Sequence, residues 1–193
     1  MRPQTTVTPD SPLVKVLVRG ACPICALMRA FQNSIIDSPV KQPASRLCNF
    51  HTWSLAASSP ALEAVPIFRT ILQNAEAGST GSIVAADSCD WCDALRQYES
   101  ERLSEFVREM QRDRFADWLR QFGTVCLHHA DRLLATVPEA VVTLIKEVVA
   151  KNKDELQKQL AELDGKLHRG ERDGGGILGH IAEFLVSQRG VTR

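Results

Sequence analysis

The chain has 193 residues and a mass of 21.4 kDa, which is enough for one or two domains with a buried core. Hydrophobic residues make up 44% of it and charged residues 24%, a balance typical of globular proteins and not of disordered ones. The 23 basic and 23 acidic residues cancel, which argues against general nucleic-acid binding, because binders of phosphate backbones carry an excess of Lys and Arg.

The first half of the chain begins with a polar stretch and continues in helical patterns. Residues 1–11 are polar and contain prolines, so we expect a flexible arm there. Residues 12–18 fit a short helix with a first-turn proline, although their β-branched residues also suit a strand. Apolar residues at helical spacing predict helices over 25–37, 51–56 and 61–77, followed by a loop over 78–88.

The second half repeats this plan with longer helical patterns. The spacing of apolar residues predicts helices over 93–110, 115–122, 126–135, 138–169 and 177–187. Three consecutive glycines, 174–176, suggest a flexible joint before the last of them. Because we find no convincing alternating pattern of a sheet, we predict an all-α fold.

The six cysteines lie in four short motifs of two kinds. Four of them form two CxxC motifs, Cys22–Cys25 and Cys89–Cys92, and the other two each stand three residues before a histidine, in Cys48–His51 and Cys126–His129. The order CxxC, CxxH, CxxC, CxxH indicates an internal duplication with one Cys3His set per half. We therefore expect two duplicated three-helix units, 12–78 and 79–136, with 137–193 packing on them in one compact domain.

Four ligands from two such motifs suit a structural zinc ion, since Zn²⁺ prefers tetrahedral Cys and His ligands. The spacing predicts two zinc ions held by eight residues: Cys22, Cys25, Cys48, His51, Cys89, Cys92, Cys126 and His129. An up-down-up path of the helices in each half favours a site closed within that half. Pairing across the halves, with Cys22 and Cys25 joining Cys126 and His129, stays open because spacing does not fix topology.

Other roles for the cysteines remain as alternatives. Redox-active dithiols would use the CxxC motifs but would leave the cysteines of the CxxH motifs unexplained. An iron–sulfur cluster can take mixed Cys and His ligands and is the nearest chemical rival. Buried cysteines that bind no metal would not explain the paired spacing. A thiol-based redox or metal sensor, or an enzyme, is therefore the second hypothesis for the function.

The motif set resembles a bacterial and archaeal family of uncharacterised helical proteins, a domain of unknown function of about this size. The resemblance rests on the eight Cys and His positions and extends over the long helix 138–169 and the terminal helix 177–187. One departure is that Cys89 is followed by Asp90, where a proline is expected. The resemblance implies the architecture and two metal sites, and it brings no activity with it.

Further candidates for chemistry have simpler interpretations. His128 is a candidate for a packing or proton-transfer group beside His129, whereas His168 and His180 are isolated. Asp90, Asp93 and Glu99 are ordinary acids of a helix start and do not form a paired-carboxylate site. We find no nucleophile–base set and no dinucleotide fingerprint, so an enzyme is the less favoured class.

The distribution of charge points to a surface for a protein partner. Residues 1–88 hold 7 basic and 5 acidic residues, whereas 89–193 hold 16 and 18. Interface cores are poor in charge and rich in aromatic residues, so we expect a protein partner to bind the N-terminal half near Trp53. Self-association through helix 138–169 is a second possibility. Since we see no signal peptide and no membrane span, we expect a cytoplasmic protein that binds no membrane.

Overall fold

The computed structural model describes residues 12–17, 22–74, 89–171 and 176–186. All regular structure in these ranges is helical, which confirms the all-α prediction. No helix among them is long and apolar enough to cross a bilayer. The expected arm 1–11, the expected loop 78–88, and Gly174 and Gly175 of the expected joint lie outside the described residues.

The helices follow one another in a simple order along the chain. In the first half they are α1 (Pro12–Leu17), α2 (Pro23–Asp37), the short 3₁₀ helix η1 (Pro39–Lys41), α3 (Asn49–Ser58) and α4 (Ala61–Asn74). In the second half they are α5 (Asp90–Met110), α6 (Asp113–Phe122), α7 (Leu127–Leu134), α8 (Glu139–His168) and α9 (Ile177–Val186). The predicted helices are confirmed with small shifts at their ends, and 12–17 is a helix and not a strand.

The chain divides into two compact units that do not follow the two halves of the sequence. Unit 1 combines residues 1–27 with 102–193, and unit 2 consists of residues 28–101. The boundaries fall within α2 and within α5, so the chain starts in unit 1, passes through unit 2 and returns to unit 1. The duplicated arrangement of units 12–78 and 79–136 thus differs from this division.

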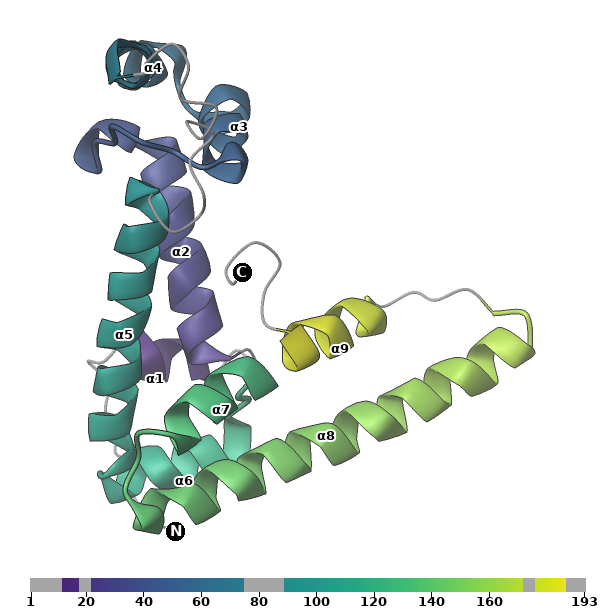
Figure 1. Cartoon of the computed structure of the whole chain (residues 1–193). Coiled ribbons are helices and arrows are strands. Elements are labelled where there is room, and N and C mark those ends of the chain that lie inside the picture. Colours follow the sequence, from purple (N-terminus) through teal and green to yellow (C-terminus); the bar gives the residue numbers. More distant parts are fainter. Residues whose placement is uncertain (1–11, 18–21, 75–88, 172–175, 187–193) are drawn as a thin grey trace, which may run out of the picture. The chain divides into compact units, whose positions relative to one another are not determined.

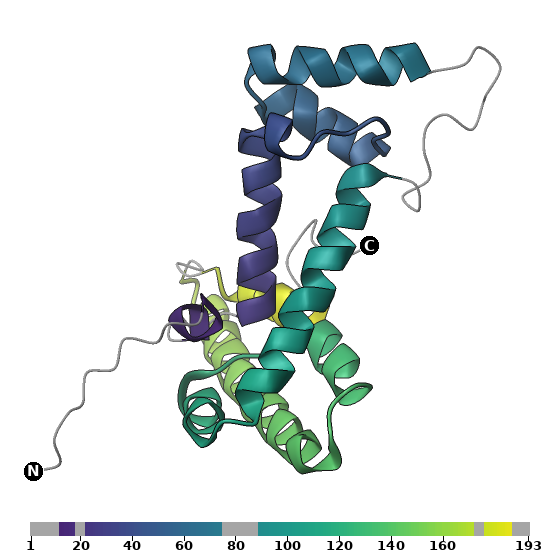
Figure 2. The same cartoon turned by 90° about the vertical axis from the view of Figure 1, so that its left-hand side faces the viewer.

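Unit 2 has a core built from four helices and the segment that leads into α3. Phe31 of α2 stacks on Tyr98 of α5 with ring centroids 4.2 Å apart. Helix α4 packs against η1 and α3 (Figure 2). The buried core contains Ile35, Ala44, Leu47, Cys48, Leu55, Ala64, Ile67, Cys89 and Trp91. Two candidate metal ligands are therefore part of the apolar core of this unit.

Unit 1 is assembled around the long helix α8. Helices α6 and α7 lie beside the N-terminal half of α8, and α9 contacts both α7 and α8 (Figure 1). Helix α1 packs on α6. Side chains that are almost fully buried in this unit include Leu13, Ile24, Phe106, Leu119, Val125, Leu133 and Ile145. This packing holds the first turns of α2 and α7 in one unit, where the candidate ligands of both helices lie.

Candidate metal centres

Each of the four Cys/His motifs begins a helix in the same way. The first cysteine of each motif stands just before α2, α3, α5 or α7, and its carbonyl oxygen accepts the first helical hydrogen bond, from the residue four positions later (2.9–3.0 Å). The second ligand of the motif lies in the first helical turn. Both side chains of a motif thus reach the same side of a helix start, where the free N–H groups favour negative charge.

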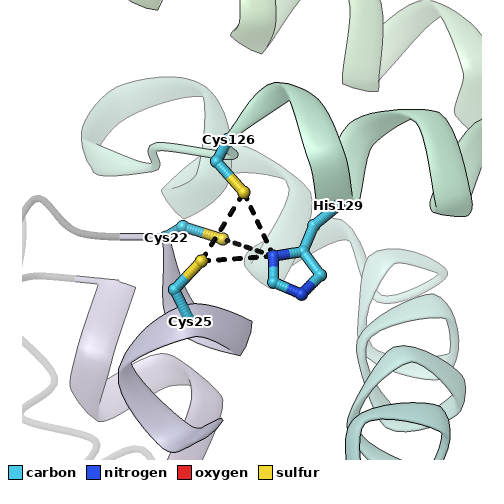
Figure 3. Close-up of side chains that lie close together, drawn as sticks. All are labelled: Cys22, Cys25, Cys126 and His129. Carbon is cyan, nitrogen blue, oxygen red and sulfur yellow. Dashed lines mark hydrogen bonds between the residues drawn. The ribbon is translucent and has the colours of Figure 1, made fainter. Parts of the chain in front are cut away.

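Cluster 1 lies in unit 1 and joins the motifs that begin α2 and α7: Cys22, Cys25, Cys126 and His129 (Figure 3). The three sulfur atoms lie 3.6, 3.2 and 3.1 Å from Nδ1 of His129, in chain order. The Sγ atoms of Cys25 and Cys126 are 3.5 Å apart. All four side chains point to one spot, and all four are buried.

Cluster 2 lies in unit 2 and joins the motifs that begin α3 and α5: Cys48, His51, Cys89 and Cys92. Nδ1 of His51 lies 3.5, 3.3 and 3.4 Å from the sulfur atoms of the three cysteines, in chain order. The Sγ atoms of Cys48 and Cys92 are 3.8 Å apart. Three of these residues are buried, and Cys92 is partly exposed.

The structure groups the ligands across the halves of the sequence. Pairing within each half, which the duplication favoured, is wrong, and the arrangement that the spacing left open is the one observed. The first and fourth motifs form cluster 1, and the second and third form cluster 2, so one site is nested within the other along the chain. All eight predicted ligand residues fall into these two clusters, and in each cluster the four ligand atoms lie within 4.8 Å of one another. Each set could hold one metal ion.

The thiols of each cluster influence one another strongly. Hydrogen bonding with Cys126 and Cys22 lowers the pKa of the Cys25 thiol far below its usual value, whereas burial raises the pKa of the Cys22 thiol well above it. In cluster 2, burial and the charge of Cys89 raise the pKa of Cys92. Three thiolates this close repel one another, and a bound divalent cation would remove that repulsion.

The pKa of Cys48 moves in the opposite direction from that of Cys92. Burial opposes ionisation of Cys48, but the backbone N–H groups of His51 and Phe50, together with the neighbouring thiols, lower its pKa. These N–H groups belong to the first turn of α3, so the helix start itself favours the thiolate.

Two residues for which the sequence predicted no role in a metal site contact the chain beside cluster 2. Asp90 and Trp91, the spacer residues of the second CxxC motif, both hydrogen-bond to the segment that precedes Cys48. Asp90 was expected to be an ordinary helix-start acid. The signal for its role is its position, since it replaces the proline expected after the first cysteine.

The remaining histidines lie outside the two clusters. The ring of His128 meets that of His129 edge to face at 5.1 Å, which fits a packing role beside the candidate ligand. His168 and His180 are exposed, and His168 contacts the Asp164 carboxylate on the same helix at 3.4 Å. The two candidate ligand histidines are buried, whereas His128 is half-buried and His168 and His180 are exposed.

Comparisons with known proteins found no match to this chain. No protein family model, no curated protein and no solved structure matches the chain. This outcome agrees with the resemblance to a family without an assigned activity, and it leaves the geometry of the two clusters as the basis for a functional interpretation.

Proposed function

We propose that the protein is a zinc-stabilised helical scaffold in which each cluster holds one structural Zn²⁺. The observation that carries the proposal is the pair of four-donor clusters of thiols and imidazole, each confined to one unit. A closed set of four protein ligands leaves no position for water or substrate, which is typical of structural and not of catalytic zinc. The proposed place of action is the reducing cytoplasm, where thiols stay available as ligands.

The distances within the clusters support a single ion in each. Around tetrahedral zinc, with bonds of about 2.3 Å to sulfur and about 2.0 Å to nitrogen, two sulfurs are about 3.8 Å apart and sulfur and nitrogen about 3.5 Å apart. The Cys25–Cys126 and Cys48–Cys92 sulfur pairs measure 3.5 and 3.8 Å, and the sulfur–nitrogen pairs 3.1–3.6 Å. The donors therefore already stand near the separations that zinc requires.

The same distances disfavour an iron–sulfur cluster. Ligands that bind different irons of such a cluster are more than about 6 Å apart, because the irons and the bridging sulfides stand between them. The donor atoms of each cluster here all lie within 4.8 Å of one another. A mononuclear ion fits this space without movement of the helix starts.

The charge of the loaded site also suits its surroundings. Three thiolates, one neutral imidazole and Zn²⁺ give a net charge of about −1. Two helix starts point at each cluster, and the positive ends of the helix dipoles stabilise this negative charge. Metal binding would supply folding free energy of about 10 kcal/mol or more per site, as in zinc-finger peptides.

A neighbouring pair of histidines provides the test of the zinc assignment. We expect His129→Gln to lose one of two zinc ions, measured as the metal-to-protein ratio after purification without added metal. His128→Gln is the matched control and should keep both ions, because His128 lies beside cluster 1 without belonging to its four donors. Equal metal content in the two variants would contradict the assignment.

The scaffold is proposed to bind a protein partner through unit 2. Trp53 of α3 is 70% exposed, and on α4 Leu62 and Leu72 are 92% and 72% exposed. A groove on α4 is lined by Val65, Phe68, Arg69, Leu72 and Gln73, of which Arg69 alone is charged. The complementary partner is a protein segment that presents an acidic side chain beside apolar ones.

A second candidate function is a redox sensor, and the partial exposure of Cys92 supports it. The Cys48 and Cys92 sulfur atoms are 3.8 Å apart, close enough to form a disulfide after small movements. Two thiolates, one hydrogen peroxide and two protons would give one disulfide and two water molecules, and the zinc ion would leave. Rapid zinc release by stoichiometric peroxide would support the sensor, whereas retention of both ions supports the scaffold.

A further inference from the structure

The segment before Cys48 is fastened to the start of α5 by Asp90. The backbone N–H groups of Ser45 and Arg46 donate to Oδ2 of Asp90 at 2.7 and 3.0 Å, and the Ser45 hydroxyl donates to the same oxygen at 3.1 Å. In return, the N–H of Asp90 donates to the carbonyl oxygen of Arg46 at 3.0 Å. The guanidinium of Arg46 lies 3.5 Å from Oδ1 of Asp90.

Trp91 fastens the same segment at a second point. Its indole Nε1–H donates to the carbonyl oxygen of Gln42 at 2.9 Å, and its side chain is fully buried. The ring also meets the imidazole of His51 edge to face at 5.6 Å. Trp91 therefore contacts both the segment before Cys48 and the ligand that follows Cys48.

These contacts close the same loop of the chain that a metal ion would close. Ser45 and Arg46 lie two to three residues before Cys48, and Asp90 lies between Cys89 and Cys92. Hydrogen bonds between charged and backbone groups are among the stronger ones in proteins, and here they hold the two helix starts within reach of each other. A metal ion then meets donors already gathered, and less of its binding free energy goes into ordering the chain.

The spacer residues of the other CxxC motif lack this chemistry. Pro23 has no backbone N–H, and neither Pro23 nor Ile24 has a side-chain acceptor; both are buried. The two CxxC motifs thus share their ligands but differ in what lies between them. This difference gives a physical reason for the acid at position 90, where a proline is expected.

We propose that Asp90 and Trp91 are positioning residues of cluster 2, which hold its two ligand pairs together and so raise its metal affinity. This inference rests on the proposed metal binding. It concerns cluster 2 alone, so its failure would leave a two-zinc scaffold intact, whereas loss of metal from both clusters in the native chain would remove the proposed function itself.

The test is a competition between the full zinc-loaded chain and a chromophoric chelator. The imidazole NMR signals of His51 and His129 report release from cluster 2 and cluster 1 separately. We expect Asp90→Ala to lower the metal affinity of cluster 2 by about 10- to 100-fold and to leave that of cluster 1 unchanged. Substitution of residues that orient metal ligands typically has an effect of this size. Asp90→Asn should recover part of the affinity, since its amide oxygen still accepts from the two N–H groups.

Asp93 provides a matched control. It lies in the same first turn of α5, and its carboxylate pairs with Arg96 on that helix. Asp93→Ala removes the same charge from the helix start, so we expect it to leave the affinity of cluster 2 within about threefold of the native value. An equal effect of Asp93→Ala and Asp90→Ala would overturn the proposal, because the helix dipole would then explain both.

A second pair of measurements separates positioning from a general loss of stability. Trp91→Phe removes one hydrogen bond and keeps an aromatic ring, so it should weaken cluster 2 while the absorption spectrum of the cobalt-loaded chain stays native. In the metal-free native chain, the Trp91 indole proton should remain protected from exchange. Rapid exchange of that proton, or unchanged affinity in both Asp90→Ala and Trp91→Phe, would overturn the proposal.

Discussion

The sulfur atoms of Cys25 and Cys126 lie 3.5 Å apart although the two residues are separated by 101 positions in the chain. This contact joins the first CxxC motif to the last CxxH motif, and the two middle motifs form their own cluster between them in sequence. The inner cluster belongs to unit 2 and the outer one to unit 1. Each candidate metal thus ties together segments of a single unit, and the outer one joins the two ends of the chain that form unit 1.

Double cysteine variants distinguish this nested pairing from pairing within each half. Cys25→Ser combined with Cys126→Ser removes two ligands from cluster 1, so we expect about one metal per chain to remain. Cys25→Ser combined with Cys48→Ser damages both clusters, and we expect both ions to be lost or weakly held. Native mass spectrometry of the intact chain gives the counts. The opposite pattern would establish pairing within each half.

Access to the sulfur atoms predicts which thiolate reacts first. In the proposed metal-loaded chain all six cysteines would serve as thiolates, and Cys92 alone among them is partly exposed. We expect iodoacetamide to label Cys92 before the five buried cysteines, as read by peptide mass spectrometry after brief labelling. First labelling of Cys22 or Cys126 would show that cluster 1 is the more open of the two.

Two glycines of unit 1 should respond in opposite ways to the same change. A Cβ atom at Gly123, which follows α6, would lie 2.9 Å from the Cα of Leu119 and would also collide with its side chain. Gly123→Ala should therefore destabilise the chain by about 1–3 kcal/mol. At Gly165, inside α8, the nearest atom is a flexible guanidinium nitrogen of Arg169 at 3.5 Å.

We therefore expect Gly165→Ala to stabilise the chain by about 1 kcal/mol, because alanine favours the helix. Urea unfolding of the zinc-loaded variants measures both effects on one scale. A loss of stability in Gly165→Ala equal to that of Gly123→Ala would contradict the packing described for α6 and α8.

The proposed partner surface predicts a local effect of charge on binding. Leu72→Glu places an acid in the groove on α4 and should lower the affinity for the partner by at least tenfold, with Trp53→Glu as a test of the neighbouring helix. Leu178→Glu in α9 is the control, since Leu178 is also exposed but belongs to unit 1. The partner is first captured by cross-linking and then titrated in purified form. Equal affinities of all three variants would exclude this surface.

The sequence predicts the helices and the ligand residues because both depend on local spacing. Apolar residues at three- and four-residue intervals mark the helices, and a separation of three residues places two ligands in one helix start. Trp53 was expected at a surface from its charge-poor setting, and it is exposed. Binding of a partner there, and self-association through 138–169, stay predictions.

The pairing of the motifs could not be predicted because it depends on how far each helix carries the chain. Helix α2 has 15 residues and is thus about 22 Å long, and only the three-residue η1 separates it from the segment before Cys48. The up-down-up path requires a returning helix at this point. Without one, the first CxxC motif and the first CxxH motif fall into different units.

The proposed role of Asp90 could be predicted from the sequence only in part. An acid at the start of a helix is common, and its favourable interaction with the helix dipole explains it without any contact elsewhere. Its three hydrogen bonds come from residues 44 and 45 positions away, which no local pattern encodes. The absence of the expected proline at this position agrees with the proposed positioning role of Asp90.

The central claim, two mononuclear zinc sites, is tested most directly by elemental analysis of the native chain purified gently and without added metal. We predict two zinc ions per chain, with no acid-labile sulfide. Less than one metal ion per chain, or iron together with sulfide, would contradict the account.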